Sequence, residues 1–390
     1  MNKIFQIKWY SLIMGIVLIL TLIIGGYCIS IDNGITFIFY CSVFLSSIFL
    51  MHFASVSDNI FLFWFSIIIA STVMAFRAQT GYDDFVYKEI YFRAEEYGFF
   101  TYIFQGAEEL GFLIINYVFY HILFGNYQIF QIIITLFTFF LWGHAILKYK
   151  KYGSFTLFLF FLWTHYYFIV MSAGLVRIFI ALPLVFEAIY YFVENNVKLF
   201  ISFIFIASLF HVSSIFILVL LLMQVNRVKF FNYWKLFVMI LAIIIPIGFI
   251  IIAKVLVPIL GTKYSGYDTI GNLAVSVRDF DVLPICVIGI YFLKKINDED
   301  RKMMIIAIVL CFMSIMFSIY DSMVNLGRLS FYGNLGIMIV GSKCNSILEK
   351  NTLNIIISIF FIIYGIVYMM YTAFLNPSNV IFLFPYVSIW

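Results

Sequence analysis

The sequence predicts an all-α protein that crosses a membrane many times, and its composition is the first reason. Of the 390 residues, 65% are hydrophobic and only 11% are charged, whereas a soluble globular domain is roughly 45–50% apolar and about 25% charged. The second reason is that apolar runs of about 20 residues, enough for one transmembrane helix, recur along the whole chain. This pattern excludes a water-soluble enzyme, a nucleic-acid-binding domain and a receptor with a single membrane anchor.

Apolar segments that could each span a membrane are found from one end of the chain to the other. They are residues 9–31, 35–53, 59–76, 127–147, 154–172, 175–193, 235–257, 282–296, 303–320, 329–342 and 352–375. Segments 109–124 and 199–224 are ambiguous, so we expect about 11–14 transmembrane helices, some short or re-entrant, in one membrane domain over 1–390. The first span is expected to be retained, because it is over-long for a signal peptide and no cleavage pattern of small residues follows it.

Positive charges indicate which ends of the spans face the cytoplasm, because Lys and Arg gather in cytoplasmic loops. Six clusters hold 15 of the 23 basic residues: Lys3 and Lys8; Lys148, Lys150 and Lys151; Lys198; Arg227, Lys229 and Lys235; Lys294, Lys295, Arg301 and Lys302; Lys343 and Lys350. All six clusters, and the N-terminus, can face the cytoplasm if two segments do not cross the membrane simply. Segment 109–124 would dip into the membrane and return to the outer face. Segment 199–224 would break near Phe210–His211 into two short helices that meet at the outer face.

Simple crossings by both segments would also satisfy the alternation of loops, but they would leave 12 basic residues inside and 11 outside. The charge distribution therefore favours the two irregular segments. A membrane tolerates irregular backbone only where protein or water lines it. We therefore expect a functional site where these segments end.

Two polar loops are predicted on the extracytoplasmic side, 77–108 and 258–281. The stretch 77–109, which is the first loop and the residue after it, carries more acids than bases. The seven acids are Asp83, Asp84, Glu89, Glu95, Glu96, Glu108 and Glu109, and the three bases are Arg77, Lys88 and Arg93. Near-helical spacing of Tyr82, Val86, Ile90, Ala94 and Tyr97, with the i,i+4 pairs Asp84–Lys88 and Glu89–Arg93, predicts an amphipathic helix at the membrane surface. Glu89, Glu95 and Glu96 suit a solvated face. Asp83, beside the end of a span, is placed where a general base could meet a lipid-linked substrate.

Ionisable residues inside apolar segments are costly in lipid and mark candidate sites. Arg177 has no other charge between Tyr152 and Phe186, and His211 lies among apolar and hydroxyl residues. Each also has a structural interpretation, an arginine in an ion pair or a histidine satisfied in the core. A third group, Asp321, Asn325, Arg328 and Tyr332, shares one helix face. It could form an interhelical ion pair or the polar wall of an outer cavity.

These residues share one chemistry, with arginines and a histidine near the outer leaflet facing an acid-rich loop. Arginine binds phosphate through bidentate donors, a departing pyrophosphate needs its charge neutralised, and an acceptor hydroxyl needs a carboxylate base. The combination describes glycosyl transfer from a polyprenyl-diphosphate donor without a nucleotide. No Walker-type loop or HExxH motif is present, and five cysteines without a C-x-x-C pair predict neither a disulfide framework nor a metal cluster.

The same residues fall in motifs that resemble the EpsG family of Wzy-type polysaccharide polymerases. The matching pieces, in family order over roughly 75–335, are Arg77 with Gly81–Tyr87, then Glu109–Phe112, Arg177–Ala181, Phe210–Ser214 and Arg328–Tyr332. The family usually has G-T-D-Y where this chain has Gly81-Tyr82-Asp83-Asp84, so the choice between the two aspartates stays open. It often has glutamine after the arginine, where this chain has Ile178.

The resemblance implies a polymerase at the outer face of the bacterial cytoplasmic membrane, with an architecture related to GT-C membrane glycosyltransferases. It would transfer a growing glycan from undecaprenyl diphosphate onto a lipid-linked repeat unit in capsule, exopolysaccharide or O-antigen synthesis, alongside a chain-length regulator and a flippase. No cofactor or metal is expected. The alternatives are a flippase or transporter of the lipid-linked oligosaccharide, and a ligase or acyltransferase of the same pathway.

Under the polymerase hypothesis each candidate residue has a role. Asp83 or Asp84 is the base, with Glu109 as the second candidate carboxylate. The expected ligands of the diphosphate or sugar are Arg77, Arg177, His211, Asn325, Arg328 and Tyr332.

Overall fold

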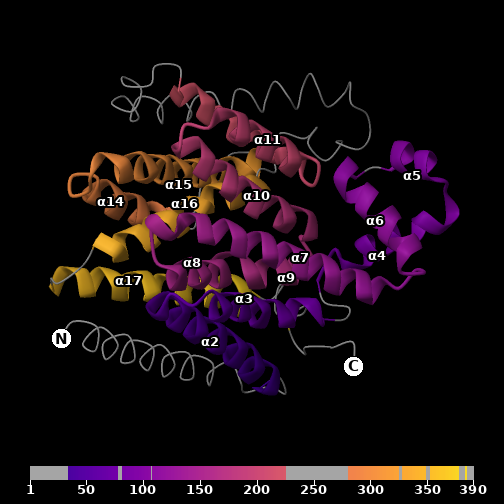
Figure 1. The fold of residues 1–390 in the computed structure, drawn as a ribbon, viewed down its shortest axis with the longest axis horizontal. Helices are drawn as coiled ribbons and strands as arrows, with labels where there is room; N and C mark the ends of the chain where they lie inside the picture. Colours follow the sequence, from indigo (N-terminus) through magenta and orange to yellow (C-terminus); the bar gives the residue numbers. More distant parts are fainter. Residues whose placement is uncertain are drawn as a thin grey trace.

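The computed structural model describes residues 34–77, 81–106, 108–224, 280–324, 327–347, 352–376 and 383, and these residues are largely helical (Figure 1). The spans expected at 9–31 and 235–257 lie outside the described residues, as do all but the last two residues of the loop expected at 258–281. Five described helices are long and apolar enough to cross a membrane, and shorter apolar helices lie between them. The predicted all-α, multi-span fold class is confirmed.

Most helices match the apolar segments predicted from the sequence, while α4 and α5 lie in the polar loop predicted at 77–108. The helices are α2 Gly34–Ser57, α3 Ile60–Ala75, α4 Asp84–Glu96, α5 Phe99–Gln105, α6 Leu110–Ile122, α7 Tyr127–Lys148, η1 Tyr149–Lys151, α8 Phe155–Leu162, η2 Trp163–Tyr167, α9 Phe168–Ala173, α10 Val176–Val193, α11 Val197–Ser208, η3 Val212–Gln224, α14 Leu283–Phe292, α15 Asp298–Val324, α16 Gly327–Ile347, α17 Thr352–Met369 and η8 Met370–Phe374. The span expected at 154–172 is one run of α8, η2 and α9, in which η2 is a π-turn.

Small polar side chains join the helices inside the bundle. The Trp163 indole donates a hydrogen bond to Ser47 Oγ at 3.0 Å, and Ser66 Oγ donates to the Ser47 carbonyl at 2.7 Å. These bonds tie α2, α3 and η2 together. Between membrane helices such bonds contribute specificity, because lipid leaves little hydrophobic driving force for helix association.

Glycines bring α15 and α16 into backbone contact. A Cβ on Gly336 would lie 2.3 Å from the Ala307 carbonyl oxygen, and one on Gly333 would lie 2.5 Å from the Ser314 nitrogen. Small residues at such an interface let two membrane helices approach closely. This contact holds the start of α16, with Arg328 and Tyr332, at one end of the bundle.

Of the two segments that were ambiguous in the sequence, 199–224 is interrupted and 109–124 is a single short helix, α6. Segment 199–224 breaks at Leu209–His211, between the end of α11 and the start of η3, which confirms the predicted break. The 13 residues of α6 extend about 20 Å, well short of the roughly 30 Å hydrocarbon core. A tight turn then leads into α7, with Phe124 and Gly125 at positive φ.

Helices α4, α5 and α6 form a cap at one end of the molecule (Figure 1), with a hydrophobic core separate from that of the bundle. The prediction of which α4 face is apolar was wrong in part, since Tyr82 and Val86 are 73% and 47% exposed. The buried face carries Tyr87, Ile90, Tyr91 and Ala94 instead. The reason is that α4 packs against aromatic side chains of α6 and α7, which fixes its rotation.

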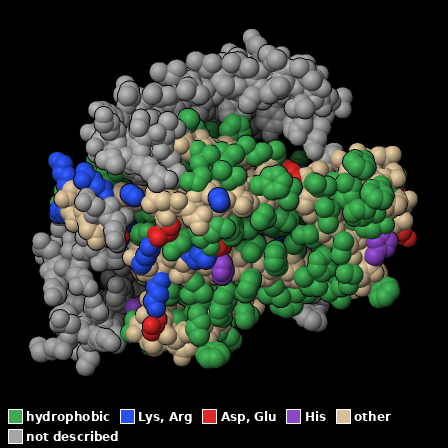
Figure 2. Space-filling model, turned by 45° about the horizontal axis from the view of Figure 1, so that its top comes forward, with side chains coloured by type: hydrophobic (Ala, Val, Ile, Leu, Met, Phe, Trp, Pro, Cys, Tyr) green, Lys and Arg blue, Asp and Glu red, His purple; other side chains and the backbone are tan. Residues whose placement is uncertain are grey.

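Basic residues gather at the end of the bundle opposite the cap. Here ion pairs join the ends of neighbouring helices and the loops between them: Lys150 to Asp58 at 2.5 Å, Lys151 to Glu194 at 2.6 Å, and Lys343 of α16 to Asp300 of α15 at 2.7 Å. Figure 2 shows Lys and Arg side chains toward the left of the face, while hydrophobic side chains cover much of the flank. The bundle therefore has one lysine-rich end and, at the other, the cap with the starts of α10 and α16.

The backbone contact at Gly336 gives the first prediction. Gly336→Ala should lower the melting temperature of the purified protein in detergent, since forcing a methyl group into a packed interface costs about 1–3 kcal/mol. Gly98→Ala is the matched control, because a Cβ there meets no atom within 4 Å. Equal melting temperatures for the two variants would contradict the α15–α16 packing.

Candidate active site

The candidate site is built where breaks in the helices meet, and two glycines form the first junction. Gly174 adopts φ 71° and ends α9 three residues before Arg177. Gly81 adopts φ 116°, and a Cβ on it would lie 2.8 Å from the Met171 carbonyl oxygen. Both φ values lie in the region that glycine adopts without steric cost. The Asp83 amide therefore reaches the Ala173 carbonyl, at 3.3 Å, and Asp83 lies against the break that precedes Arg177.

A third glycine forms the second junction. The Gly111 amide donates to the Leu209 carbonyl at 2.8 Å, and a Cβ on Gly111 would lie 2.8 Å from that same oxygen. The start of α6 thus docks on the break between α11 and η3. Glu109, which precedes α6, is brought beside His211 by this contact.

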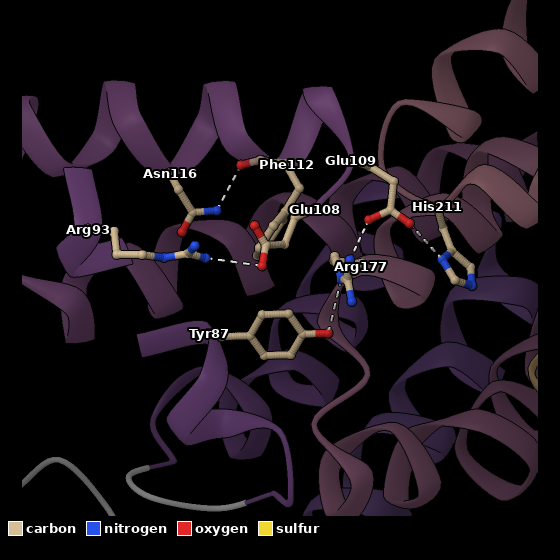
Figure 3. Close-up of polar contacts among 8 residues, drawn as sticks. All are labelled: Tyr87, Arg93, Glu108, Glu109, Phe112, Asn116, Arg177 and His211. Carbon is tan, nitrogen blue, oxygen red and sulfur yellow. Dashed lines mark hydrogen bonds and ion pairs between the residues drawn. The ribbon is translucent and has the colours of Figure 1, made fainter. Parts of the chain in front are cut away.

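Ion pairs connect the two junctions (Figure 3). The Arg177 Nη1 donates to Glu109 Oε2 at 2.5 Å, while His211 Nδ1 lies 3.4 Å from Glu109 Oε1. On its other side, Arg177 Nε donates to the Tyr87 hydroxyl at 3.5 Å. One carboxylate therefore holds an arginine from α10 and a histidine from the α11–η3 break. The partner of Arg177 comes from a distant part of the chain, not from Glu187 on its own helix.

Several buried polar atoms beside this network have no hydrogen-bond partner among the described residues. They are His211 Nε2, Ser214 Oγ, and the hydroxyls of Ser213 and Tyr332, which lie close to each other without forming a well-aligned hydrogen bond. The Tyr332 ring lies nearly parallel to His211, with centroids 6.3 Å apart. Buried polar groups are almost always hydrogen-bonded in proteins, so this group of donors and acceptors is typical of a site that takes up water or a polar ligand.

Asp83 lies in the electrostatic field of both arginines. Burial raises the pKa of Asp83 above its ordinary value, and the positive charges of Arg328 and Arg177 oppose that rise. Asp83 is half-buried and Arg328 is exposed. A carboxylate with a raised pKa is a better proton acceptor than an ordinary aspartate, because basicity rises with pKa.

Glu109 has the opposite protonation behaviour. Burial alone would raise its pKa, but the hydrogen bond from His211 and the charges of Arg177 and His211 lower it to about 2. Such a carboxylate stays ionised and binds a proton only weakly. Its geometry therefore suits holding Arg177 and His211 in place, and suits proton transfer poorly.

Arg77 and Asp84 are not part of this group. Arg77 is only 2% exposed and its carbonyl accepts a hydrogen bond from Gln131 at 2.7 Å, while its Nε and Nη1 have no hydrogen-bond partner in the described chain. Asp84 is 8% exposed and accepts a hydrogen bond from the Tyr127 hydroxyl at 3.3 Å. Burial raises the pKa of Asp84, and the charge of Arg77 opposes this. The two adjacent aspartates thus face different surroundings.

The remaining candidates are placed as follows. Asn325 lies outside the described residues. Arg93, expected to pair with Glu89, pairs with Glu108 at 3.0 Å, because the chain after α5 returns alongside α4. Tyr87, Ser213 and Ser214 were not chosen from the sequence, although all three fall inside the matched motifs. In the part of the chain that the structure describes, no group of three or more His, Cys, Asp or Glu residues could hold a metal ion.

Comparison with known proteins identifies the family. Neither the curated proteins nor the solved structures gave a match, so the expected GT-C-like architecture stays a prediction. A family model described as the EpsG family matches residues 60–388, which covers most of the chain and all of the motifs around the site. The chain therefore belongs to the EpsG family.

Proposed function

We propose that this protein is a polysaccharide polymerase that transfers a growing glycan from undecaprenyl diphosphate onto a lipid-linked repeat unit. Membership of the EpsG family suggests a polymerase-type role in polysaccharide synthesis. The observation that carries the specific reaction is the convergence of Asp83, Arg177, His211, Arg328 and Tyr332 at one end of a membrane bundle. A base, two guanidinium groups and unsatisfied polar atoms are the groups that this transfer requires.

In the proposed reaction a hydroxyl oxygen of the acceptor sugar attacks the anomeric carbon of the donor glycan. The bond between that carbon and the diphosphate oxygen breaks, and the diphosphate departs with the electron pair. The Asp83 carboxylate accepts the proton of the attacking hydroxyl. Arg177 and Arg328 neutralise the charge that develops on the leaving diphosphate, which is where preorganised cations contribute most.

Glu109 and His211 support this chemistry from the side of the donor. Glu109 fixes the orientation of the Arg177 guanidinium and of the His211 ring. If His211 Nδ1 carries the proton that faces Glu109, its unsatisfied Nε2 is an acceptor for a sugar hydroxyl; a protonated ring would donate to phosphate. Arg77, just after α3, and Asp84, the first residue of α4, are both buried and would hold the loop that carries Asp83.

The proposed orientation follows from charge. The ion-paired lysines lie at the end of the bundle opposite the site, and lysine-rich loops face the cytoplasm. The site would then open to the extracytoplasmic side of the bacterial cytoplasmic membrane. There it would meet lipid-linked repeats, without a nucleotide sugar and with a chain-length regulator and a flippase as partners.

Removal of a site arginine tests the function. Arg328→Ala should lower the polymerisation rate about 100–1000-fold, the usual effect of losing a contact to transition-state charge, so that single repeats remain on a gel. Arg177→Ala should abolish long chains as well. Arg177→Ala leaves Glu109 without its cation and could disturb folding. Arg177→Lys keeps a cation there and is included to separate an effect on folding from an effect on activity.

Lys88→Ala, on the exposed side of α4, is the control and should make normal chains.

Purified protein in liposomes with synthetic lipid-linked repeats separates an enzyme from a flippase. A polymerase lengthens the glycans without a gradient or a second leaflet, whereas a flippase only moves them across the bilayer. Wild-type chain lengths from both the Arg328→Ala and Arg177→Ala variants would refute the proposed function.

The pH dependence of the rate tests the role of Asp83. Activity requires the deprotonated carboxylate, so the rate falls as pH drops through the pKa of Asp83. The positive charge of Arg328 lowers that pKa. In the pH–rate profile of Arg328→Gln, the fall of the residual rate on the acidic side (the acidic limb) should therefore begin at a higher pH than in the wild type. Asp83→Asn should remove the acidic limb together with most of the activity, about 100–10,000-fold. An unshifted acidic limb in Arg328→Gln would assign the base to another group.

A further inference from the structure

A second polar pocket lies in the cap, outside the network around Arg177. Its volume is about 100 Å³, and it is lined by Arg93, Tyr97, Tyr102, Gln105, Gly106 and Leu113. Tyr102 and Leu113 are buried and form its floor, while Tyr97 and Gln105 are exposed at its rim. The pocket is therefore open to solvent on the side of the cap that α4 and α5 share.

The pocket and the candidate active site are linked through neighbouring residues of the chain. Glu108, which binds the pocket arginine, and Glu109, which binds Arg177, are consecutive residues (Figure 3). Along α4, Arg93 lies six residues beyond Tyr87, about 9 Å along the helix axis. The start of this same helix carries Asp83. An oligosaccharide whose reacting hydroxyl lies at Asp83 could follow α4 and place a later sugar in the pocket.

The chemistry of the lining favours a neutral, hydroxylated ligand. The charge of Arg93 is balanced by Glu108 at 3.0 Å, so the pocket offers little net charge to an anion. The Tyr97 hydroxyl, the Gln105 amide and the part-exposed Arg93 guanidinium, 32% accessible, supply donors and acceptors. The Tyr102 hydroxyl already donates to the Ile90 carbonyl at 2.8 Å and can only accept. Three buried polar atoms nearby have no hydrogen-bond partner in the described residues: Arg93 Nε, Glu108 Oε2 and Asn116 Oδ1. These atoms could still form hydrogen bonds with water or a ligand.

The size of the pocket suits one sugar ring that is partly enclosed. A closed cavity of about 150 Å³ holds a benzene molecule, so a pocket of about 100 Å³ with an open rim takes part of a six-membered ring and leaves the rest exposed. The exposed Tyr97 at the rim offers a ring face to the apolar side of a sugar.

We propose that this Arg93 pocket is a binding subsite for a sugar of the acceptor repeat unit, beyond the sugar that carries the reacting hydroxyl. The inference rests on the proposed polymerase function. The assignment to the acceptor follows from position: the pocket lies on α4 beyond Asp83, whereas Arg177, His211 and Tyr332, which would hold the donor, lie on α10, the α11–η3 break and α16.

The test uses the full-length protein in liposomes and an acceptor that cannot act as a donor. The probe is an alkyl glycoside of the repeat unit recovered from the polymer of the same cells, which lacks a diphosphate. Gln105→Ala removes a rim amide from an exposed position, so folding is preserved. It should raise the KM for the alkyl glycoside about five-fold, the effect of one lost hydrogen bond, with kcat and the KM for the lipid-linked donor unchanged.

Arg93→Lys is the second variant, since it keeps the charge beside Glu108 and loses the planar fork of donors. It should raise the acceptor KM about ten-fold. Glu89→Ala, on an exposed part of α4 away from the pocket, is the matched control and should leave all constants unchanged. A wild-type acceptor KM in both pocket variants would show that the pocket holds only water and would overturn the inference.

Failure of the inference and failure of the proposed function give different results. If the pocket variants behave as wild type while Asp83→Asn is inactive, the subsite is refuted and the polymerase stands. If Arg328→Ala extends glycans normally, the proposed function itself is refuted, and the subsite with it.

Discussion

The ion pair between Arg177 and Glu109 is the interaction on which the arrangement of the site depends. It joins the start of α10 to the start of α6, and Glu109 in turn orients His211 at the break between α11 and η3. Three interruptions in the helices thereby meet at one end of the bundle. A charged guanidinium part-buried in a membrane protein is costly unless it is paired, so the carboxylate both stabilises Arg177 and determines which loops surround it.

A good part of this arrangement could be predicted from the sequence, because lipid penalises polar groups so strongly. The spans stand out as apolar runs, and Arg177 and His211 stand out because charge and imidazole are rare within them. The break at Phe210–His211 followed from the distribution of Lys and Arg alone. These inferences succeed because each depends on the free energy of placing a residue of that segment in lipid. This free energy can be judged from the segment alone.

Other features depend on contacts between segments and were beyond prediction from one sequence. Nothing local distinguishes Asp83 from Asp84; the structure separates them by leaving Asp83 half-buried in the field of Arg328 and Arg177 and by burying Asp84 against the Tyr127 hydroxyl. The apolar face of α4 was only partly identified, because packing against α6 and α7 decides its rotation. Tyr87 could not be singled out among 27 tyrosines, and the partner of Arg93 depends on the return of the chain after α5.

The backbone contact between the Gly81 loop and Gly174 has a consequence for how such a protein could change its specificity. Asp83 is located by main-chain atoms, through its amide and the Ala173 carbonyl, and two glycines leave the room for this approach. Replacement of the residues that line the surrounding space could therefore adapt the protein to differently decorated sugars while the reacting carboxylate stays where it is.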